Sequence, residues 1–195
     1  MQPKLLVCCE FSQTVTTAFL EKGFDAWSND IIDCEGQYKD RHLKMDARKA
    51  VFMHSWDLII AHPPCTYITA MQGYMFNPKF DFYNTRYPKL LEARDFFMFF
   101  WNFVDVPLCI ENPRPLRLAA LPRESQVVCP TMFGDKYTKR TCLWLKDLPL
   151  LLQTVSRPLN TKSFVYSTRG GHNRSKLSPY LAQAMADQWA PLFIK

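Results

Sequence analysis

Short apolar segments, each followed at once by a polar cluster, recur along residues 4–113 of this chain. The clearest runs from Trp56 to Ala61 and is stopped by His62 and two prolines. A short apolar run between such breakers is typical of a strand that is buried on both faces. Strands of this kind belong to parallel sheets that helices cover on both sides. The pattern therefore predicts an α/β fold.

Strand and helix patterns alternate along the chain. We expect helices over 12–23, 88–104 and 179–189, with Ser12 as the N-cap and Gly23 as the C-cap of the first helix, and Pro88 in the first turn of the second. Residues 150–178 read mostly as loop. Strands are predicted at residues 4–9, 24–30, 42–45, 56–61, 108–110, 125–130 and 141–145. Strand, helix, strand order implies parallel pairs.

The size and composition fit one soluble domain over 1–195, since the chain has 195 residues, of which 48% are hydrophobic and 22% charged. Seven scattered cysteines without a Cys-x-x-Cys pair predict neither a disulfide framework nor a zinc site, and indicate a reducing compartment. No export signal is apparent, and no apolar run reaches the roughly 20 residues of a membrane span. We expect a cytoplasmic protein without membrane contact or a bound metal.

The charge balance favours anionic partners. Lysine and arginine number 24 against 18 acidic residues, which gives a net charge of +6. A basic excess of this kind favours anionic partners such as nucleic acid or nucleotides.

The polar clusters that follow the strands are the candidate functional residues. In an open parallel sheet the ligand lies outside the carboxyl ends of the strands. All of these clusters should therefore share one rim of the sheet. They are Glu10-Phe11-Ser12, Asn29-Asp30, Asp46, His62-Pro63-Pro64-Cys65 and Glu111-Asn112-Pro113.

Three of these segments, in this order along the chain, carry a specific resemblance. Pro63-Pro64-Cys65 after a strand, Glu111-Asn112 after a later strand, and Phe133-Gly134 followed by Lys139-Arg140-Thr141 resemble the signature motifs of DNA cytosine carbon-5 methyltransferases, and the closest resemblance is to compact, phage-type proteins of that family. The resemblance implies a Rossmann-like methyltransferase fold with a mainly parallel sheet and an antiparallel edge. It also places the last helix beside the first strand.

The resemblance implies covalent chemistry on a pyrimidine. Cys65 would add as a thiolate to carbon-6 of cytosine, so its pKa should lie below the free value of about 8.5 in an electropositive pocket that also holds His62. Glu111 would face ring nitrogen-3 with a raised pKa, and Arg140 would hold the base carbonyl or orient the thiol. The base would be a flipped or single-stranded cytosine.

The resemblance also implies S-adenosylmethionine as the methyl donor. Its ribose hydroxyls would bind Asp30, with Asn29 as the alternate, and its adenine amine would bind Asp46. The first loop would hold the methionine end through Glu10, Phe11 and Ser12, beside Pro63. Thr66 would lie near the base, and the basic loop would contact phosphate through Arg169, Arg174 and Lys176.

Departures from the family pattern leave two alternatives open. The first loop has no glycine where the family has Phe-x-Gly-x-Gly, Thr66 replaces a glutamine, and His62 replaces a small residue. Only about 30 residues separate the strand after Arg140 from the last helix, where the family carries a target-recognition domain. The chain could be a catalytically silent module that binds nucleic acid or a partner enzyme. Alternatively, it methylates free pyrimidine nucleotides or RNA, or relies on a partner subunit for target recognition.

Overall fold

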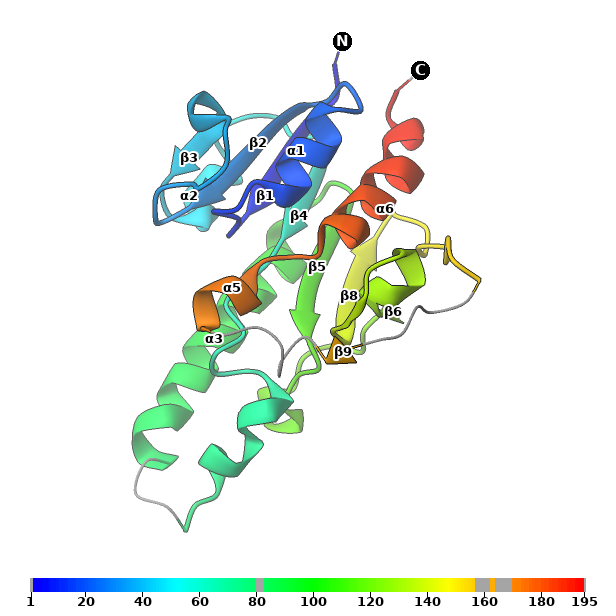
Figure 1. The fold of residues 1–195 in the computed structure, drawn as a ribbon. Helices are drawn as coiled ribbons and strands as arrows, with labels where there is room; N and C mark the ends of the chain where they lie inside the picture. The colour runs from blue at the N-terminus through cyan, green and yellow to red at the C-terminus, as the bar shows by residue number, and fades with distance from the viewer. Residues whose placement is uncertain (1, 80–82, 157–161, 164–169, 195) are drawn as a thin grey trace.

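A computed structural model describes residues 2–79, 83–156, 162–163 and 170–194, and gives only the backbone of Lys162 and Arg174. A seven-stranded sheet forms its centre, in the order β3-β2-β1-β4-β5-β8-β6 (Figure 1). The pairs between β3 and β5 are all parallel, whereas β8 runs antiparallel to β5 and to β6. The expected α/β sheet with an antiparallel edge is confirmed. The strands are β1 Lys4–Cys8, β2 Asp25–Asp30, β3 His42–Lys44, β4 Leu58–Ala61, β5 Leu108–Pro113, β6 Gln126–Val128 and β8 Thr141–Lys146.

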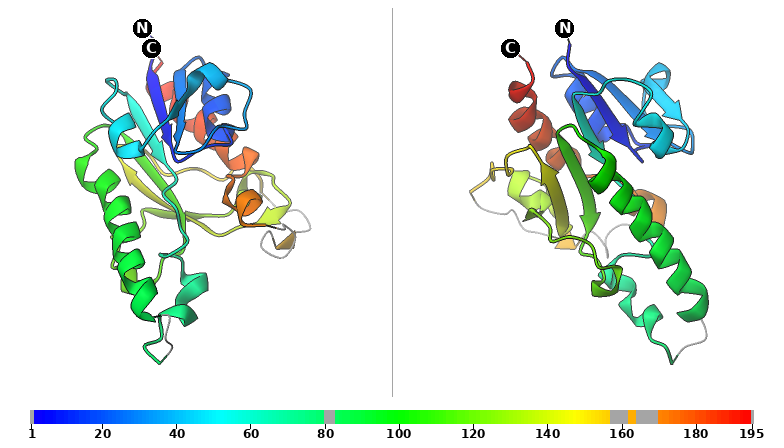
Figure 2. Two further views of the ribbon diagram at one scale, coloured as in Figure 1. Left: turned by 90° about the vertical axis from the view of Figure 1, so that its left-hand side faces the viewer. Right: turned by 180° about the vertical axis from the view of Figure 1, so that it is seen from behind.

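Helices cover both faces of this sheet (Figures 1 and 2). One core joins α1 and α6 to Leu5, Val7, Leu58 and Ile60. The alternate residues of the same strands, such as Leu6 and Ile59, point to the opposite face and pack against α2 and α3. This is why these strands are apolar without alternation. The helices are α1 Thr14–Leu20, α2 Ala47–Ala50, α3 Tyr83–Phe103, α5 Gly171–Ser175 and α6 Pro179–Trp189.

Shorter elements complete the fold. Strands β7 and β9 form a separate parallel pair. The beginning of α3, together with η2, extends beyond the sheet (Figure 2). Among the described helices, none is long and apolar enough to cross a membrane. The short elements are β7 Tyr137–Thr138, β9 Lys162–Ser163 and the 3-10 helices η1 Lys39–Arg41, η2 Ala70–Phe76, η3 Arg117–Ala119, η4 Pro130–Phe133 and η5 Ala190–Leu192.

Two helix starts differ from the sequence prediction. Pro88 lies inside α3, which already includes Tyr83. Ring stacking of Tyr83 on Tyr87, at 5.5 Å, and packing of Arg86 over the Tyr67 ring hold the turn that precedes the proline. The N-cap of α1 is residue 13 instead of Ser12, because Glu10 supplies the side-chain acceptor for the free amides of this helix.

Strand β5 is longer than predicted. It continues through Glu111 and Asn112 to Pro113, because β8 pairs with it over its whole length. The predicted loop of residues 150–178 also contains β9 and α5. Helix α6 begins where predicted, and it packs against α1 on the face that also covers β1.

Candidate active site

The predicted rim is present at the carboxyl ends of the parallel strands. The register aligns Cys8 of β1 with Asn29 of β2 and with Ala61 of β4, and Ala61 with Ile110 of β5. The residues that follow these strands are therefore neighbours. Backbone bonds tie them together, since the amide of Glu10 donates to the Asn29 carbonyl at 2.8 Å.

A buried histidine and glutamate pair links the ends of β4 and β5. His62 Nδ1 lies 3.1 Å from Glu111 Oε2, and the two side chains are only 10% and 8% exposed. Burial raises the pKa of Glu111, but the hydrogen bond from His62 and the positive charges of Lys139 and His62 outweigh it. The pKa of Glu111 is thus lowered, and the sequence expectation of a raised pKa is wrong because it overlooked this partner.

The Cys65 thiol is partly exposed and follows the two prolines, as expected. The backbone carbonyl of Cys65 accepts hydrogen bonds from the amides of Ile68 and Thr69. These bonds form a helical turn after the prolines. Burial raises the pKa of Cys65, and the charge of Glu111 raises it further, against the opposing charge of Lys139. The expected pKa below the free value is wrong, because burial disfavours the charged thiolate and the nearby ionised Glu111 disfavours a second negative charge.

Lys139, not Arg140, is the cation of this cluster. The charge of Lys139 lowers the pKa of both Cys65 and Glu111, and its ammonium group donates to the Lys176 carbonyl at 3.3 Å. The Arg140 side chain is exposed, and its charge acts on Cys142. Lys139 and Arg140 lie in the short segment between β7 and β8.

Asn112 fixes the proline turn that carries Cys65. Its Nδ2 donates to the carbonyl of the buried Pro63 at 2.6 Å. This bond connects β5 to the segment that follows β4. The cysteine is therefore positioned by two adjacent strands.

The acidic residues on the cofactor side have different partners. Glu10 accepts from the amides of Val15 and Thr16, at 2.6 and 3.2 Å, and from the Thr16 hydroxyl. Its carboxylate therefore caps α1. Asp46 caps α2 through the Arg48 amide, and its ion pair with that arginine, at 2.6 Å, lowers its pKa.

Asp30 keeps more of its capacity to bind a ligand. Its Oδ1 accepts from the amide of Ile31 at 2.7 Å, and its Oδ2 has no hydrogen bond among the described residues. Burial raises the pKa of Cys9, and the charges of Asp30 and Asp46 raise it further. Both carboxylates therefore lie near the first loop. Asn29, the alternate, is buried and donates to the carbonyls of Leu43 and Met45.

The first loop reaches its conformation without glycine. Cys9 and Gln13 have φ angles of 59° and 57°, in the left-handed region that glycine usually occupies. The buried Gln13 side chain is bonded to Ser28 and to the backbone of Tyr38, which holds its strained backbone in place. Gly36 allows this contact, because a Cβ atom there would overlap the Gln13 side chain.

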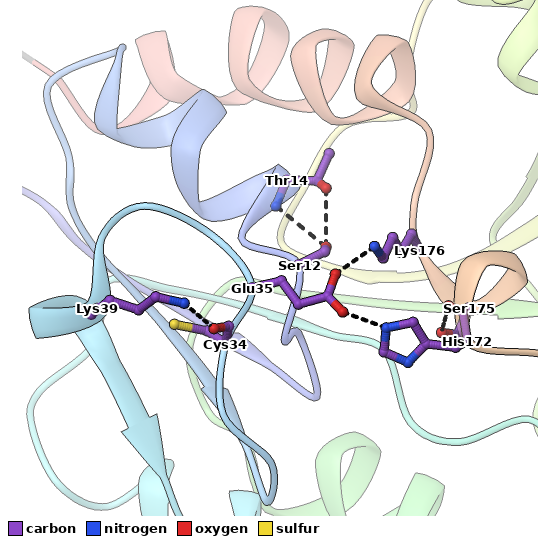
Figure 3. Close-up of polar contacts among 8 residues, drawn as sticks. All are labelled: Ser12, Thr14, Cys34, Glu35, Lys39, His172, Ser175 and Lys176. Carbon is purple, nitrogen blue, oxygen red and sulfur yellow. Dashed lines mark hydrogen bonds and ion pairs between the residues drawn. The ribbon is translucent and has the colours of Figure 1, made fainter.

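A strap of residues 171–177, formed by α5 and the two residues after it, covers the first loop. Glu35 bonds His172 and Lys176 of this strap, each at 2.5 Å (Figure 3). The His172 ring stacks on Phe11 with 4.5 Å between ring centroids, and the Lys176 ammonium lies over the same ring. The loop after β2, the first loop and the strap are thereby joined.

A small pocket lies beneath this strap. Its cavity volume is about 10 Å³, and it is lined by Cys9, Glu10, Phe11, Ser12, His62, Ser175, Lys176 and Leu177. The predicted cofactor residues of the first loop therefore meet His62 at one cavity. Ligand pockets for drug-sized molecules measure about 300–1,000 Å³, so a nucleoside cofactor would need the strap to move outward.

The predicted nucleic-acid residues are distributed differently. Thr66 is exposed on the turn after Cys65. Lys176 is engaged with Glu35, which lowers the pKa of that glutamate. Arg169 and the side chain of Arg174 lie outside the described residues.

Sequence reasoning missed the pairing of His62 with Glu111 and the role of Glu35. The first had a signal, because His62 directly follows β4 on the same rim as Glu111. The second had none, since Glu35 and His172 are 137 residues apart in the chain.

Comparisons with known proteins give only distant similarities. No protein-family model matches the chain, and no curated protein matches it. One similar solved structure is a putative DNA modification methyltransferase encoded within a prophage of E. coli, with a TM-score of 0.44, 14% identity, and coverage of 74% of this chain and 46% of that one. Another is a mutant of Spodoptera frugiperda DNMT2, with a TM-score of 0.40, 15% identity, and coverage of 83% and 53%.

This chain thus spans about half the length of each of these two proteins. Both the TM-scores and the identities are low. The functional proposal below therefore depends on the residues of the site.

Proposed function

We propose that this protein is an S-adenosylmethionine-dependent methyltransferase that acts on carbon-5 of cytosine in DNA. The observation that carries the proposal is the electrostatic contact between a partly exposed thiol, Cys65, and a buried carboxylate, Glu111, at the ends of adjacent parallel strands. A nucleophile and a proton-sharing carboxyl are the two groups that carbon-5 methylation requires. The order of the Pro-Pro-Cys and Glu-Asn segments along the chain supports the same assignment.

In this proposal Cys65 and Glu111 act on opposite parts of the base. The Cys65 thiolate adds to carbon-6, which makes carbon-5 nucleophilic. Glu111 holds ring nitrogen-3 and shares a proton with it, so that negative charge does not accumulate on the ring. When carbon-5 has gained its methyl group, its proton leaves to water and the bond to Cys65 breaks, which releases the thiolate.

Lys139 supports both groups. Its positive charge stabilises the Cys65 thiolate against the repulsion from Glu111. Arg140, exposed at the next position, is available for the base carbonyl or for the phosphate backbone.

The residues around the first loop fit S-adenosylmethionine once the strap opens. Bound there, this cofactor would supply an electrophilic methyl group. Asp30 has a carboxylate oxygen available for the ribose hydroxyls, and Ile31 and Ile32, which are 72% and 44% exposed, offer apolar surface for a flat ring. Glu10 shapes the first loop through its cap on α1, and Phe11, Ser12 and Pro63 would hold the methionine end of the cofactor. Asp46 would reach the adenine amine only by sharing its carboxylate with Arg48.

DNA is the proposed substrate because of the basic charge of the chain and the chemistry of the site. A cytosine can reach Cys65 only outside a base stack, either flipped from a duplex or in a single strand. In this proposal a partner subunit recognises the target sequence.

A second candidate function is a catalytically silent binding module. The strap favours it, because the closed pocket is smaller than a nucleoside cofactor requires. So does the raised pKa of Cys65, which keeps the thiol protonated at neutral pH.

Calorimetric titration with S-adenosylmethionine separates these functions. We expect saturable binding, and Asp30→Ala should weaken it about tenfold or more, because a charge-assisted hydrogen bond worth roughly 1.5 to 3 kcal/mol is lost. Asp33→Ala is the matched control, since Asp33 lies in the same loop but pairs with Lys44. Mass spectrometry of nucleosides from co-expressed DNA should then detect 5-methylcytosine. No saturable binding at millimolar cofactor would favour the silent module.

A further inference from the structure

Three polar atoms at the ends of β4 and β5 are buried without a hydrogen-bond partner among the described residues. They are His62 Nε2, Glu111 Oε1 and Asn112 Oδ1. Each belongs to a side chain whose other polar atom is bonded: His62 Nδ1 to Glu111 Oε2, and Asn112 Nδ2 to the Pro63 carbonyl. Each of the three side chains is therefore oriented by one hydrogen bond, and each has one atom left to bind something else.

Unpaired buried polar atoms are costly. Each one forfeits about 1–3 kcal/mol of solvation, and most such atoms in native proteins are paired. Three of them on two neighbouring strands indicate a site whose partners arrive with a ligand. His62 also lines the pocket beneath the strap, so the cluster lies between that pocket and Cys65.

We propose that His62 is a positioning residue that stores the proton which Glu111 needs for cytosine. This inference rests on the proposed methyl transfer. The bond from Nδ1 to Oε2 orients the carboxyl group and leaves Oε1 for the base. Glu111 becomes a proton donor only when His62 gives up its own proton.

One proton moves from His62 through Glu111 to the base and returns. Before the base binds, the proton is on His62 Nδ1 and Glu111 is a carboxylate. As Cys65 adds to carbon-6, the Nδ1 proton moves to Glu111, and His62 becomes neutral. A half-turn of the carboxyl group, about a soft terminal torsion, presents the O–H to ring nitrogen-3. When Cys65 leaves as a thiolate, the proton on nitrogen-3 returns to Glu111 and then to His62.

Several charged or titratable groups surround this pair. Lys139, from the segment before β8, lowers the pKa of Glu111 together with His62. The negative charge of Glu111 contributes to the raised pKa values of three cysteines, Cys65, Cys109 and Cys142. Glu10 and Lys176 share the pocket with His62. Glu111 is the hydrogen-bonded carboxylate partner of His62 in this cluster.

The first test uses the free protein and needs no activity. The carboxyl carbon of Glu111 is followed by NMR during a pH titration of the wild type and of His62→Asn, whose amide replaces Nδ1 but carries no charge. We expect the Glu111 midpoint to rise by at least about half a pH unit in the variant. His54→Asn, at an exposed position against Trp27 and Trp56, is the control. An unchanged Glu111 midpoint, with thermal unfolding intact, would overturn the proposal.

The second test measures methyl transfer to a short single-stranded oligonucleotide that contains cytosine. His62→Asn should slow transfer by about 10²-fold near neutral pH, the lower range for loss of a proton-transfer group. The ratio of wild-type to variant rate should shrink as the pH falls toward 5, because solvent can then protonate Glu111 directly. A ratio independent of pH would indicate a purely structural role. If the wild type transfers no methyl group, the proposed function fails, and the NMR titration still decides the inference.

Discussion

At the scale of single residues, the opposing charges around Cys65 lead to the first prediction. The reactive thiolate should form only at a pH above the range usual for a cysteine thiol, because burial and the charge of Glu111 raise the pKa of Cys65. Glu111→Gln should shift the pH profile of Cys65 alkylation to lower pH, since a repelling charge is removed. Lys139→Met should shift it to higher pH. Mass spectrometry of iodoacetamide labelling between pH 6 and about 11 measures both shifts.

Arg140→Met is the matched control, because it removes an adjacent positive charge that acts elsewhere. We expect its alkylation profile to overlay that of the wild type. If Lys139→Met and Arg140→Met shift the pH profile of Cys65 alkylation equally, the charge near Cys65 is assigned to the wrong residue.

The residues of the site were predictable from local sequence, but their ionisation was not. Proline pairs and polar residues at strand ends are local signals, and these correctly placed Cys65 near Glu111. The pKa directions depend on where His62 and Lys139 lie around them. Lys139 is brought there by the antiparallel pairing of β8 with β5, which no local pattern of charges encodes.

At the scale of elements, the cap on α1 gives the second prediction. Glu10→Ala should lower the free energy of unfolding by about 2 kcal/mol, because buried amides at the start of α1 lose a charged acceptor. Urea denaturation measures the change. Glu21→Ala, at the exposed C-terminal end of the same helix, should be nearly neutral. A cost below about 0.5 kcal/mol for the Glu10 variant would contradict the capping role.

The strap gives the third prediction. Glu35→Gln replaces the carboxylate that bonds both His172 and Lys176, so the strap should open more often. We expect faster proteolytic cleavage within residues 170–178 and faster association of S-adenosylmethionine. Asp33→Asn, two residues earlier in the same loop, is the control. Unchanged cleavage and association rates would show that the Glu35 contacts do not hold the strap.

The first loop shows why some local features could not be predicted. The first loop has no glycine, the residue that usually adopts a left-handed backbone conformation. In the structure, Cys9 and Gln13 adopt the left-handed conformation themselves, and the bonds of Gln13 to Ser28 and Tyr38 stabilise it. Such compensation depends on residues 15 to 25 positions away in the chain. Pro88 likewise lies within α3 because aromatic contacts hold the turn before it.

At the scale of the whole molecule, the sheet and the polar residues at the carboxyl ends of its parallel strands could be predicted from the sequence. Apolar strands ending in polar clusters require a two-sided core, and the α1–α6 and α2–α3 faces provide it. The contact between the strap and the loop after β2 joins distant segments through exposed side chains. Exposed polar contacts leave no hydrophobic periodicity in a sequence, so this contact could not be predicted.

Covalent trapping tests the central claim most directly. An oligonucleotide carrying 5-fluorocytosine should form a stable adduct with Cys65 in the presence of S-adenosylmethionine, because fluorine blocks the loss of the carbon-5 proton. Peptide mass spectrometry should locate the adduct, and Cys65→Ser should abolish both the adduct and methyl transfer while cofactor affinity stays nearly unchanged. If the wild type instead methylates cytosine without forming an adduct, and Cys65→Ser remains active, carbon-5 transfer through Cys65 is contradicted.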